Sequence, residues 1–284
     1  MKVCVLHSGD IGSISSIVDA LRVSHDVSAL VFDQANPPEN VDVVLNVCDA
    51  KLDGAKVPRS LRLKNVPYAG NDTDTLLLCS DKSISKEFLV RKGIRTTRFQ
   101  VLETPKDELD AQLCFPIILS PIYKEEKVSH EIATSHLGFR AALSAVMGKA
   151  SQPIMVEEHI KGTVLRVPVI GNESPKALPI IRKEGDAYVH APVDSPIKDR
   201  VGEAALKAYA ALRMHGYGII DVIIDEGSNV FVVDIEPNCA LTSDSALAFS
   251  ASKAGLGHDK LLQLLLDLAI SRAEMVEVPI KGWQ

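Results

Sequence analysis

The chain has 284 residues, of which 46% are hydrophobic and 24% are charged, with a formal net charge of -6. This composition suits a core spread over two or three compact units, and without a basic patch it argues against nucleic acid as a partner. No apolar run approaches the length of a membrane span and no signal sequence precedes the first strand, so we expect a cytoplasmic protein without a membrane partner. Five scattered cysteines without paired spacing indicate free thiols.

The first part of the chain predicts an open parallel sheet with helices on its faces. Apolar strands are expected over residues 3–6, 27–32 and 41–47, with a helix through Ile17 and Leu21 after the first of them. An alternation of strand, helix and strand is typical of parallel sheets. The Ser/Gly loop after the first strand lacks the third glycine of a dinucleotide fingerprint, so NAD is not expected there.

The rest of the chain predicts a mixture of short strands and helices, one of which is closed by Gly93 at a C-cap position. The expected elements are, in chain order, a short strand within 65–70, a helix over 83–92, strands over 96–102 and 116–119, a helix over 139–147, a strand from 154, strands over 164–170 and 177–182, a helix over 203–214, an acidic hairpin over 218–238 and a last helix over 259–271.

The acidic hairpin is the most informative segment. Two apolar strands are joined by a turn over residues 225–229, with Asp221 at the end of the first and Asp234 and Glu236 at the end of the second. Residues two apart in a strand share a face, and Asp221 can reach that face from the neighbouring strand. Converging carboxylates repel each other unless a cation lies between them, and oxygen ligands favour Mg2+ or Mn2+. We therefore predict a metal site, with ordinary surface acids as the alternative.

Several motifs follow one another in a definite order. They are Pro67-Tyr-Ala-Gly70, Asp81-Lys82 before a helix, Val156-Glu-Glu-His-Ile-Lys-Gly162, Gly216-Tyr-Gly-Ile-Ile-Asp221, Val233-Asp-Ile-Glu-Pro-Asn238 and Leu241-Thr-Ser-Asp-Ser245. This order resembles that of the ATP-grasp superfamily, and within it the D-alanine–D-alanine ligase group, over nearly the whole chain. The resemblance implies an α/β fold of the ATP-grasp type. Its parts would be an N-terminal Rossmann-like parallel sheet over residues 1–79 and two α+β subdomains over 80–158 and 159–284.

The resemblance also implies roles for individual residues. The metal ligands would be Asp221, Asp234 and Glu236, the phosphate contact Lys82, the adenine site Glu157, Glu158 and Ile160, and the substrate side Asn238, Thr242 and Ser243. The residues alone also allow ordinary roles, because Lys82 could be a solvated first-turn residue and Ser243 a helix cap. ATP and Mg2+ are the implied cofactors, and a homodimer is an expectation from the resemblance only.

The sequence departs from the family pattern at the centre of the site. Ser120 stands where the family has a phosphate-binding lysine, Val164 where it has a ribose-binding glutamate, and Ile219 where it has an oxyanion-binding arginine. The phosphate loop carries Glu125 and Glu126 in place of glycines, which would repel a triphosphate unless they point away. Losing the arginine alone would cost on the order of 3 kcal/mol in transition-state stabilisation. The cations that could replace these groups are Arg166, Arg182 and Lys183, with Lys124 and Lys127 in the loop.

We therefore expect an ATP-dependent carboxylate–amine ligase that acts through an acyl phosphate on an amino acid or small metabolite in specialised biosynthesis. Little covalent chemistry falls to the protein in such a reaction, which depends on positioning and charge stabilisation. Two alternatives stay open. A degenerate ATP-grasp protein could bind a small molecule or partner without ligation, or it could catalyse a reaction that needs no ATP.

Overall fold

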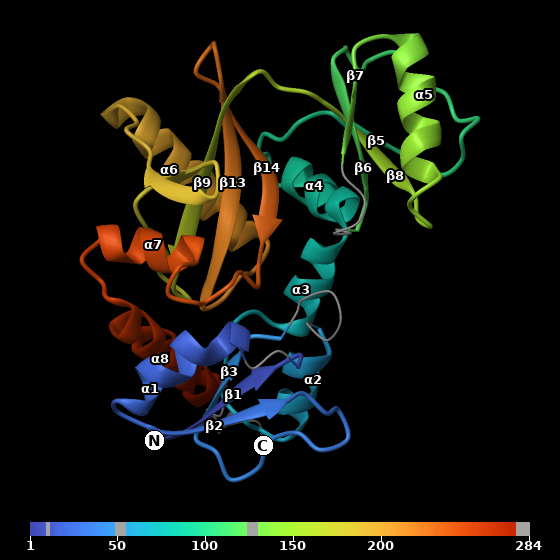
Figure 1. The fold of residues 1–284 in the computed structure, drawn as a ribbon. Helices are drawn as coiled ribbons and strands as arrows, with labels where there is room; N and C mark the ends of the chain where they lie inside the picture. Colours follow the sequence, from blue (N-terminus) through green and yellow to red (C-terminus); the bar gives the residue numbers. More distant parts are fainter. Residues whose placement is uncertain (10–11, 49–54, 124–129, 277–284) are drawn as a thin grey trace, which may run out of the picture.

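The computed structural model describes residues 1–9, 12–48, 55–123 and 130–276. In this part of the chain there are two four-stranded sheets and one six-stranded sheet. Figure 1 shows the parallel sheet at one end of the molecule, with the other two sheets side by side above it. None of the described helices combines the length and the apolar character that crossing a bilayer requires.

The N-terminal sheet has the strand order β2-β1-β3-β4, and all its pairs are parallel, as the sequence predicts. Its elements and their flanking helices are β1 (Lys2–His7), η1 (Gly12–Ile14), α1 (Ser15–Arg22), β2 (Asp26–Val31), β3 (Val43–Asn46), α2 (Lys56–Leu63) and β4 (Tyr68–Ala69). The central strands β1 and β3 are buried almost throughout, as near-continuous apolar runs in parallel sheets are. Ile17, Val18 and Leu21 form the buried stripe of α1.

The central sheet has the order β5-β8-β6-β7 with antiparallel pairs throughout. The elements of this region are α3 (Thr73–Ser80), α4 (Lys82–Arg91), β5 (Phe99–Leu102), β6 (Ile117–Pro121), β7 (Glu131–Ala133), α5 (His136–Met147) and β8 (Ile154–Glu158). Helix α5 packs on the face that carries Leu119, Ile154 and Val156. Because side chains alternate along a strand, Ser120 and Glu157 lie on the opposite face.

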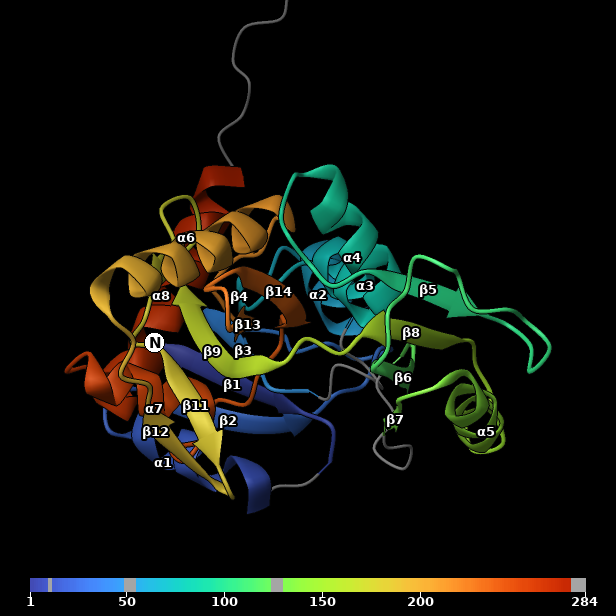
Figure 2. The same cartoon turned by 90° about the horizontal axis from the view of Figure 1, so that it is seen from above.

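The C-terminal sheet has the order β12-β11-β9-β13-β14, and β10 pairs with β9. The elements of this region are β9 (Gly162–Ile170), β10 (Lys176–Ala177), β11 (Ile181–Glu184), β12 (Ala187–His190), α6 (Ser195–Ala211), β13 (Tyr217–Asp225), β14 (Val230–Glu236), α7 (Ala246–Lys253) and α8 (His258–Val276). Helix α6 covers the face that carries Leu165, Val167 and Val222. The other face therefore carries Arg166 and Asp221. Figure 2 shows α6 lying across the sheet.

The chain end returns to the N-terminal sheet, where α8 packs its buried leucines into one cluster with β1, β3 and α1. The buried Asn71, just after β4, joins the N-terminal region to β13 and the residues that flank the acidic hairpin, because its amide donates to the carbonyls of Tyr217 and Pro237 at 2.9 and 2.6 Å and accepts from the His215 N–H at 2.7 Å. Helix α4 joins the opposite region, since Leu89 is buried among residues of α6 and the C-terminal sheet. The divisions at residues 79 and 158 stay a prediction.

Several sequence expectations are corrected by the structure. The strand expected over 177–182 is divided into β10 and β11. Helix α6 begins at Ser195 rather than 203, because Pro196 is accommodated in its first turn. Helices α2 and α3 are not predicted by the sequence patterns. Asp221 lies in the middle of β13, not at its end. Helix α4 ends as expected: Asp81 caps its N-terminus and Gly93 follows its C-terminus with a φ of +70°.

Candidate active site

A group of ionic side chains lies on the face of the C-terminal sheet opposite α6. Arg166 on β9 is directly paired with Asp221 on β13, and its Nε donates to Asp221 Oδ1 at 3.0 Å. The Nη2 of the same guanidinium donates to Glu236 Oε2 on β14. The guanidinium thus spans β13 and joins carboxylates from two strands. Bridged carboxylate–arginine pairs of this kind are among the stronger hydrogen bonds in proteins.

Burial and charge act together on these groups. Burial raises the pKa of Asp221 to about 6, and although Arg166 lowers it, Asp234 and Glu236 act in the raising direction. Burial lowers the pKa of Arg166, but Asp221 and Glu236 outweigh that effect and raise the pKa above its ordinary value. Arg166 therefore stays charged, while burial favours the protonated form of Asp221.

The predicted metal ligands are near one another but are not arranged around an open position. Asp234 is directly opposite Asp221 in the ladder, and Glu236 follows two residues later on the same face. Within the described ranges, however, no three His, Cys, Asp or Glu side chains gather closely enough to hold a metal ion. Arg166 lies between two of the three acids instead. With Arg166 between two of the acids, this arrangement does not fit a divalent cation. Metal binding by Asp221, Asp234 and Glu236 stays a prediction.

The other candidate cations differ in their placement. Ile181 is paired with Arg166, so its neighbour Arg182 lies on the opposite face of the sheet, where it is paired with Glu184. Arg182 therefore does not share a face with Arg166, and its role as a replacement cation stays a prediction. Lys183 is on the site face and is exposed. Ile219, at the position where the resemblance implies an arginine, is buried in the core beside the N-terminal sheet.

A second ionic cluster connects α4 with the central sheet. Lys86 is only 2% exposed, and its Nζ lies 2.8 Å from Glu157 Oε1. The same ammonium group donates to the hydroxyls of Thr96 and Thr97 at 3.0 and 2.6 Å, and Thr97 donates to Glu157 Oε1 at 2.7 Å. These three partners match the three N–H donors of an ammonium group. The expected adenine residue Glu157 is thus held in a closed hydrogen-bonded group.

Lys86 was missed by the sequence reasoning, which selected Lys82 as the phosphate contact. Lys82 is the first residue of α4 and is half-buried, with its backbone N–H donating to the carbonyl of Ile122. Lys86 follows one helical turn later on the same side of the helix. The sequence signal that could have identified Lys86 was its i,i+4 spacing from Lys82, which makes both lysines candidates for the same region.

The structure describes most of the positions where the sequence departs from the nucleotide contacts that the resemblance implies. Ser120 is 7% exposed, and its buried hydroxyl has no hydrogen-bond partner among the described residues. Val164 lies on the same face of β9 as Arg166 and is 53% exposed. Glu158 ends β8, and Ile160 is half-buried in the connection to β9. Glu125 and Glu126, with Lys124 and Lys127, lie outside the described residues.

The predicted substrate residues are at the junction with the N-terminal sheet. The Asn238 amide donates to the carbonyl of Cys48 at 2.8 Å and accepts from the Tyr217 hydroxyl at 3.0 Å. Ser243 is exposed, and its N–H donates to the hydroxyl of Ser16 at 3.3 Å. The structure thus brings the turn at Thr242 close to the first turn of α1, while Ser245 rather than Ser243 caps α7. Substrate contact by these residues stays a prediction.

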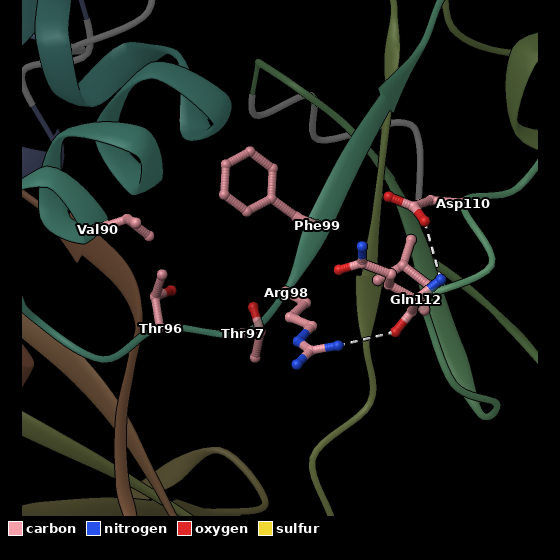
Figure 3. A pocket seen from close by; sticks show the side chains of 8 residues that line it. Val90, Thr96, Thr97, Arg98, Phe99, Asp110 and Gln112 are labelled. Atoms are coloured by element: carbon pink, nitrogen blue, oxygen red, sulfur yellow. Dashed lines mark hydrogen bonds between the residues drawn. The ribbon is translucent and has the colours of Figure 1, made fainter.

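A hollow of about 310 Å3 adjoins the Lys86 cluster at the start of β5. Figure 3 shows the Phe99 ring turned toward α4, with Asp110 and Gln112 across the hollow. Part of the rim is already hydrogen-bonded, because Arg98 Nη1 donates to the Gln112 carbonyl at 3.2 Å and the Gln112 N–H donates to Asp110 Oδ1 at 2.8 Å. Thr97 lines the hollow, so the hollow and the Lys86 cluster share a residue.

Comparisons with known proteins agree with this fold. The family described as "D-ala D-ala ligase C-terminus" matches residues 181–267. D-alanine–D-alanine ligase A of Bacillus cereus is 26% identical over 259 residues, which cover 84% of this chain and 84% of that protein.

Solved structures of such ligases are similar over almost the full length. The ligase of Coxiella burnetii has a TM-score of 0.84 at 18% identity and covers 98% of this chain and 97% of its own. The ligase of Bacillus anthracis complexed with ATP has a TM-score of 0.83 at 21% identity, with coverages of 97% and 99%. At these identities the likeness shows the fold, with its N-terminal parallel sheet and two further α+β units. The chain therefore has the fold of the D-alanine–D-alanine ligases and resembles them in sequence.

Proposed function

We propose that this protein is an ATP-dependent ligase that joins the carboxylate of an amino acid or small metabolite to an amine. In such a reaction a carboxylate oxygen attacks the γ-phosphorus of ATP, and ADP leaves as an acyl phosphate forms. The amine then attacks the carbonyl carbon, the amide bond forms, and inorganic phosphate and a proton leave. The family relatives named above and the ATP in the Bacillus anthracis ligase support the proposal.

The observation that carries the proposal is the position of Arg166. The family pattern has an arginine two residues before Asp221 on the same strand, and this chain has Ile219 there. Arg166 lies on the adjacent strand, directly opposite Asp221 and on the same face of the sheet. Its guanidinium has N–H donors beyond the two that contact carboxylates. It can therefore stabilise negative charge that develops on the reacting oxygens.

Other residues have supporting roles in the proposal. Lys86 and Glu157 would form the wall of the nucleotide site on the central sheet. The amino or carboxylic substrate would lie at the Ser16–Ser243 contact, between the N-terminal loop and the turn before α7. We assign no step to Mg2+, because Arg166 occupies the position between Asp221 and Glu236.

A second candidate function is a binding protein that keeps the fold without ligation. The observation that favours it is Ser120, whose buried hydroxyl has no partner among the described residues at the position where the family has a lysine. Lys86 does not replace that lysine readily, since its ammonium donors are already used. This candidate predicts weak nucleotide binding and no turnover.

One pair of measurements separates the two functions. Calorimetric titration of ATP with Mg2+ into the full chain measures nucleotide binding, with Asp234→Asn titrated beside it. ADP release is then followed with a panel of amino acids and amines. The ligase proposal expects ATP binding and ADP release that depends on one acid and one amine. Absence of both, in a protein with cooperative unfolding, would reject ligation and favour the binding protein.

A further inference from the structure

The guanidinium of Arg166 lies where a cation is needed to hold the acidic face together. Its Nε and Nη2 engage one oxygen each of Asp221 and Glu236, from two different strands. The Arg166 side chain is 18% exposed, and the two acids are 20% and 37% exposed. The cluster is thus partly shielded from water, where an unneutralised pair of carboxylates would be unfavourable.

A guanidinium and a divalent cation compete for the same lone pairs. A metal ion placed between Asp221 and Glu236 would compete for the two oxygens that now accept from Arg166, and would otherwise have only the second oxygen of each acid. It would also lie close to a permanently positive group, with little water between them to weaken the repulsion. The two cations therefore exclude each other at this position. In agreement, the described ranges contain no group of three or more potential ligands arranged for a metal.

We propose that Arg166 is an internal counter-cation, which fills the position between Asp221 and Glu236 so that the free protein binds no divalent cation there. Loss of the arginine charge then creates a divalent-cation site from acids that are already in place. The inference rests on the proposed active site for its relevance to catalysis, but its physical content needs neither ATP nor turnover.

The experiment measures Mn2+ binding to the full chain without nucleotide, by the loss of the electron paramagnetic resonance signal of free Mn2+. We expect no binding at this position in the wild-type protein and one bound Mn2+ in Arg166→Gln, with affinity roughly ten- to hundredfold higher than any wild-type binding. The double variant Arg166→Gln with Asp221→Asn is expected to lose that gain. The matched control is Arg182→Gln, which removes another carboxylate-paired arginine from the opposite face of the sheet and should leave Mn2+ binding unchanged.

Two outcomes overturn the inference. One is wild-type protein that binds Mn2+ as tightly as Arg166→Gln and loses it in Asp221→Asn. The other is Arg166→Gln that folds, judged by thermal unfolding, and gains no Mn2+. If Arg166→Gln does not fold, Arg166→Met replaces it: methionine also removes the positive charge, so a gain in Mn2+ affinity is still expected, and no gain rejects the inference. The proposed function is tested separately by ADP release. If no ADP is released, the ligase proposal fails, but the Mn2+ binding result still tests the role of Arg166.

Discussion

The two ionic clusters of this protein use one cation each, but they differ in how completely that cation is satisfied. The ammonium of Lys86 is buried and has one carboxylate and two hydroxyl partners. The guanidinium of Arg166 bridges two carboxylates that remain partly exposed, and it has donors to spare. A closed cluster positions the elements that form it, whereas an open cluster with excess negative charge can still respond to a ligand. We therefore regard the Lys86 cluster as support and the Arg166 cluster as the reactive part of the site.

Removing the buried cation should have the largest effect on stability. Lys86→Met leaves Glu157 charged and half-buried without its counter-ion, and it leaves two threonine hydroxyls short of a donor. We expect the free energy of unfolding to fall by about 3–5 kcal/mol in urea denaturation. Lys82→Met, one turn earlier on the same helix, should change it by less than about 0.5 kcal/mol. Equal losses in the two variants would contradict the assignment of Lys86 to the closed cluster.

Removing the guanidinium of Arg166 should lower the free energy of unfolding by a smaller amount, which depends on pH. In Arg166→Met the ionised forms of Asp221 and Glu236 lose their partner, so the pKa of Asp221 rises further above about 6. We expect a loss of about 2 kcal/mol at pH 8, because the exposed part of each acid is solvated. The loss should shrink as the pH falls through that raised pKa and Asp221 becomes neutral. Unfolding at pH 8 and pH 5 tests this, and a loss that grows toward low pH would refute it.

A lysine added at Ser120 would test whether the central sheet lacks only a phosphate contact. Ser120 lies on the same face as Glu157, and its buried hydroxyl has no hydrogen-bond partner within the part of the chain that the structure describes. We expect Ser120→Lys to bind ATP about tenfold more tightly, roughly 1.4 kcal/mol, by calorimetry. Ser120→Met, of similar length without the charge, is the control. If both variants bind ATP as wild type does, the nucleotide does not lie against this face.

The sequence predicts the strands and the turn that form the site better than it predicts the side-chain contacts within it. The apolar strands around Asp221 and Glu236 are visible as local patterns, and so is the turn between them. The pairing of Arg166 with Asp221 joins residues 55 positions apart, and it depends on the register of β9 against β13, which no local pattern determines. The choice between Lys82 and Lys86 depends on how α4 packs. The face that Arg182 occupies depends on register in the same way, since a shift of one residue moves a side chain to the other face of the sheet.

The smallest expected effect is a gain in the free energy of unfolding when the charge of Asp221 is removed, whereas removing a charged partner usually lowers it. A folded-state pKa of about 6 for Asp221, against an ordinary value of 3.8, means that the fold favours the protonated carboxyl group. The stability that Asp221 contributes is fully present below its unfolded pKa and is lost as the pH rises through about 6. Asp221→Asn resembles the protonated form at every pH, so it should be more stable than wild type at pH 8, by about 1 kcal/mol after allowance for solvent exposure.

The difference between Asp221→Asn and wild type should disappear near pH 4, where both side chains are neutral in the folded protein. Glu236 remains to hold the guanidinium in the variant, so Arg166 is not left alone. Urea denaturation of both proteins from pH 4 to pH 8 provides the measurement. A variant that is less stable than wild type at pH 8 would show that the bond between Arg166 and Asp221 outweighs the burial of the carboxylate. In that case the cluster would be closed like that of Lys86, and the contrast between the two would be lost.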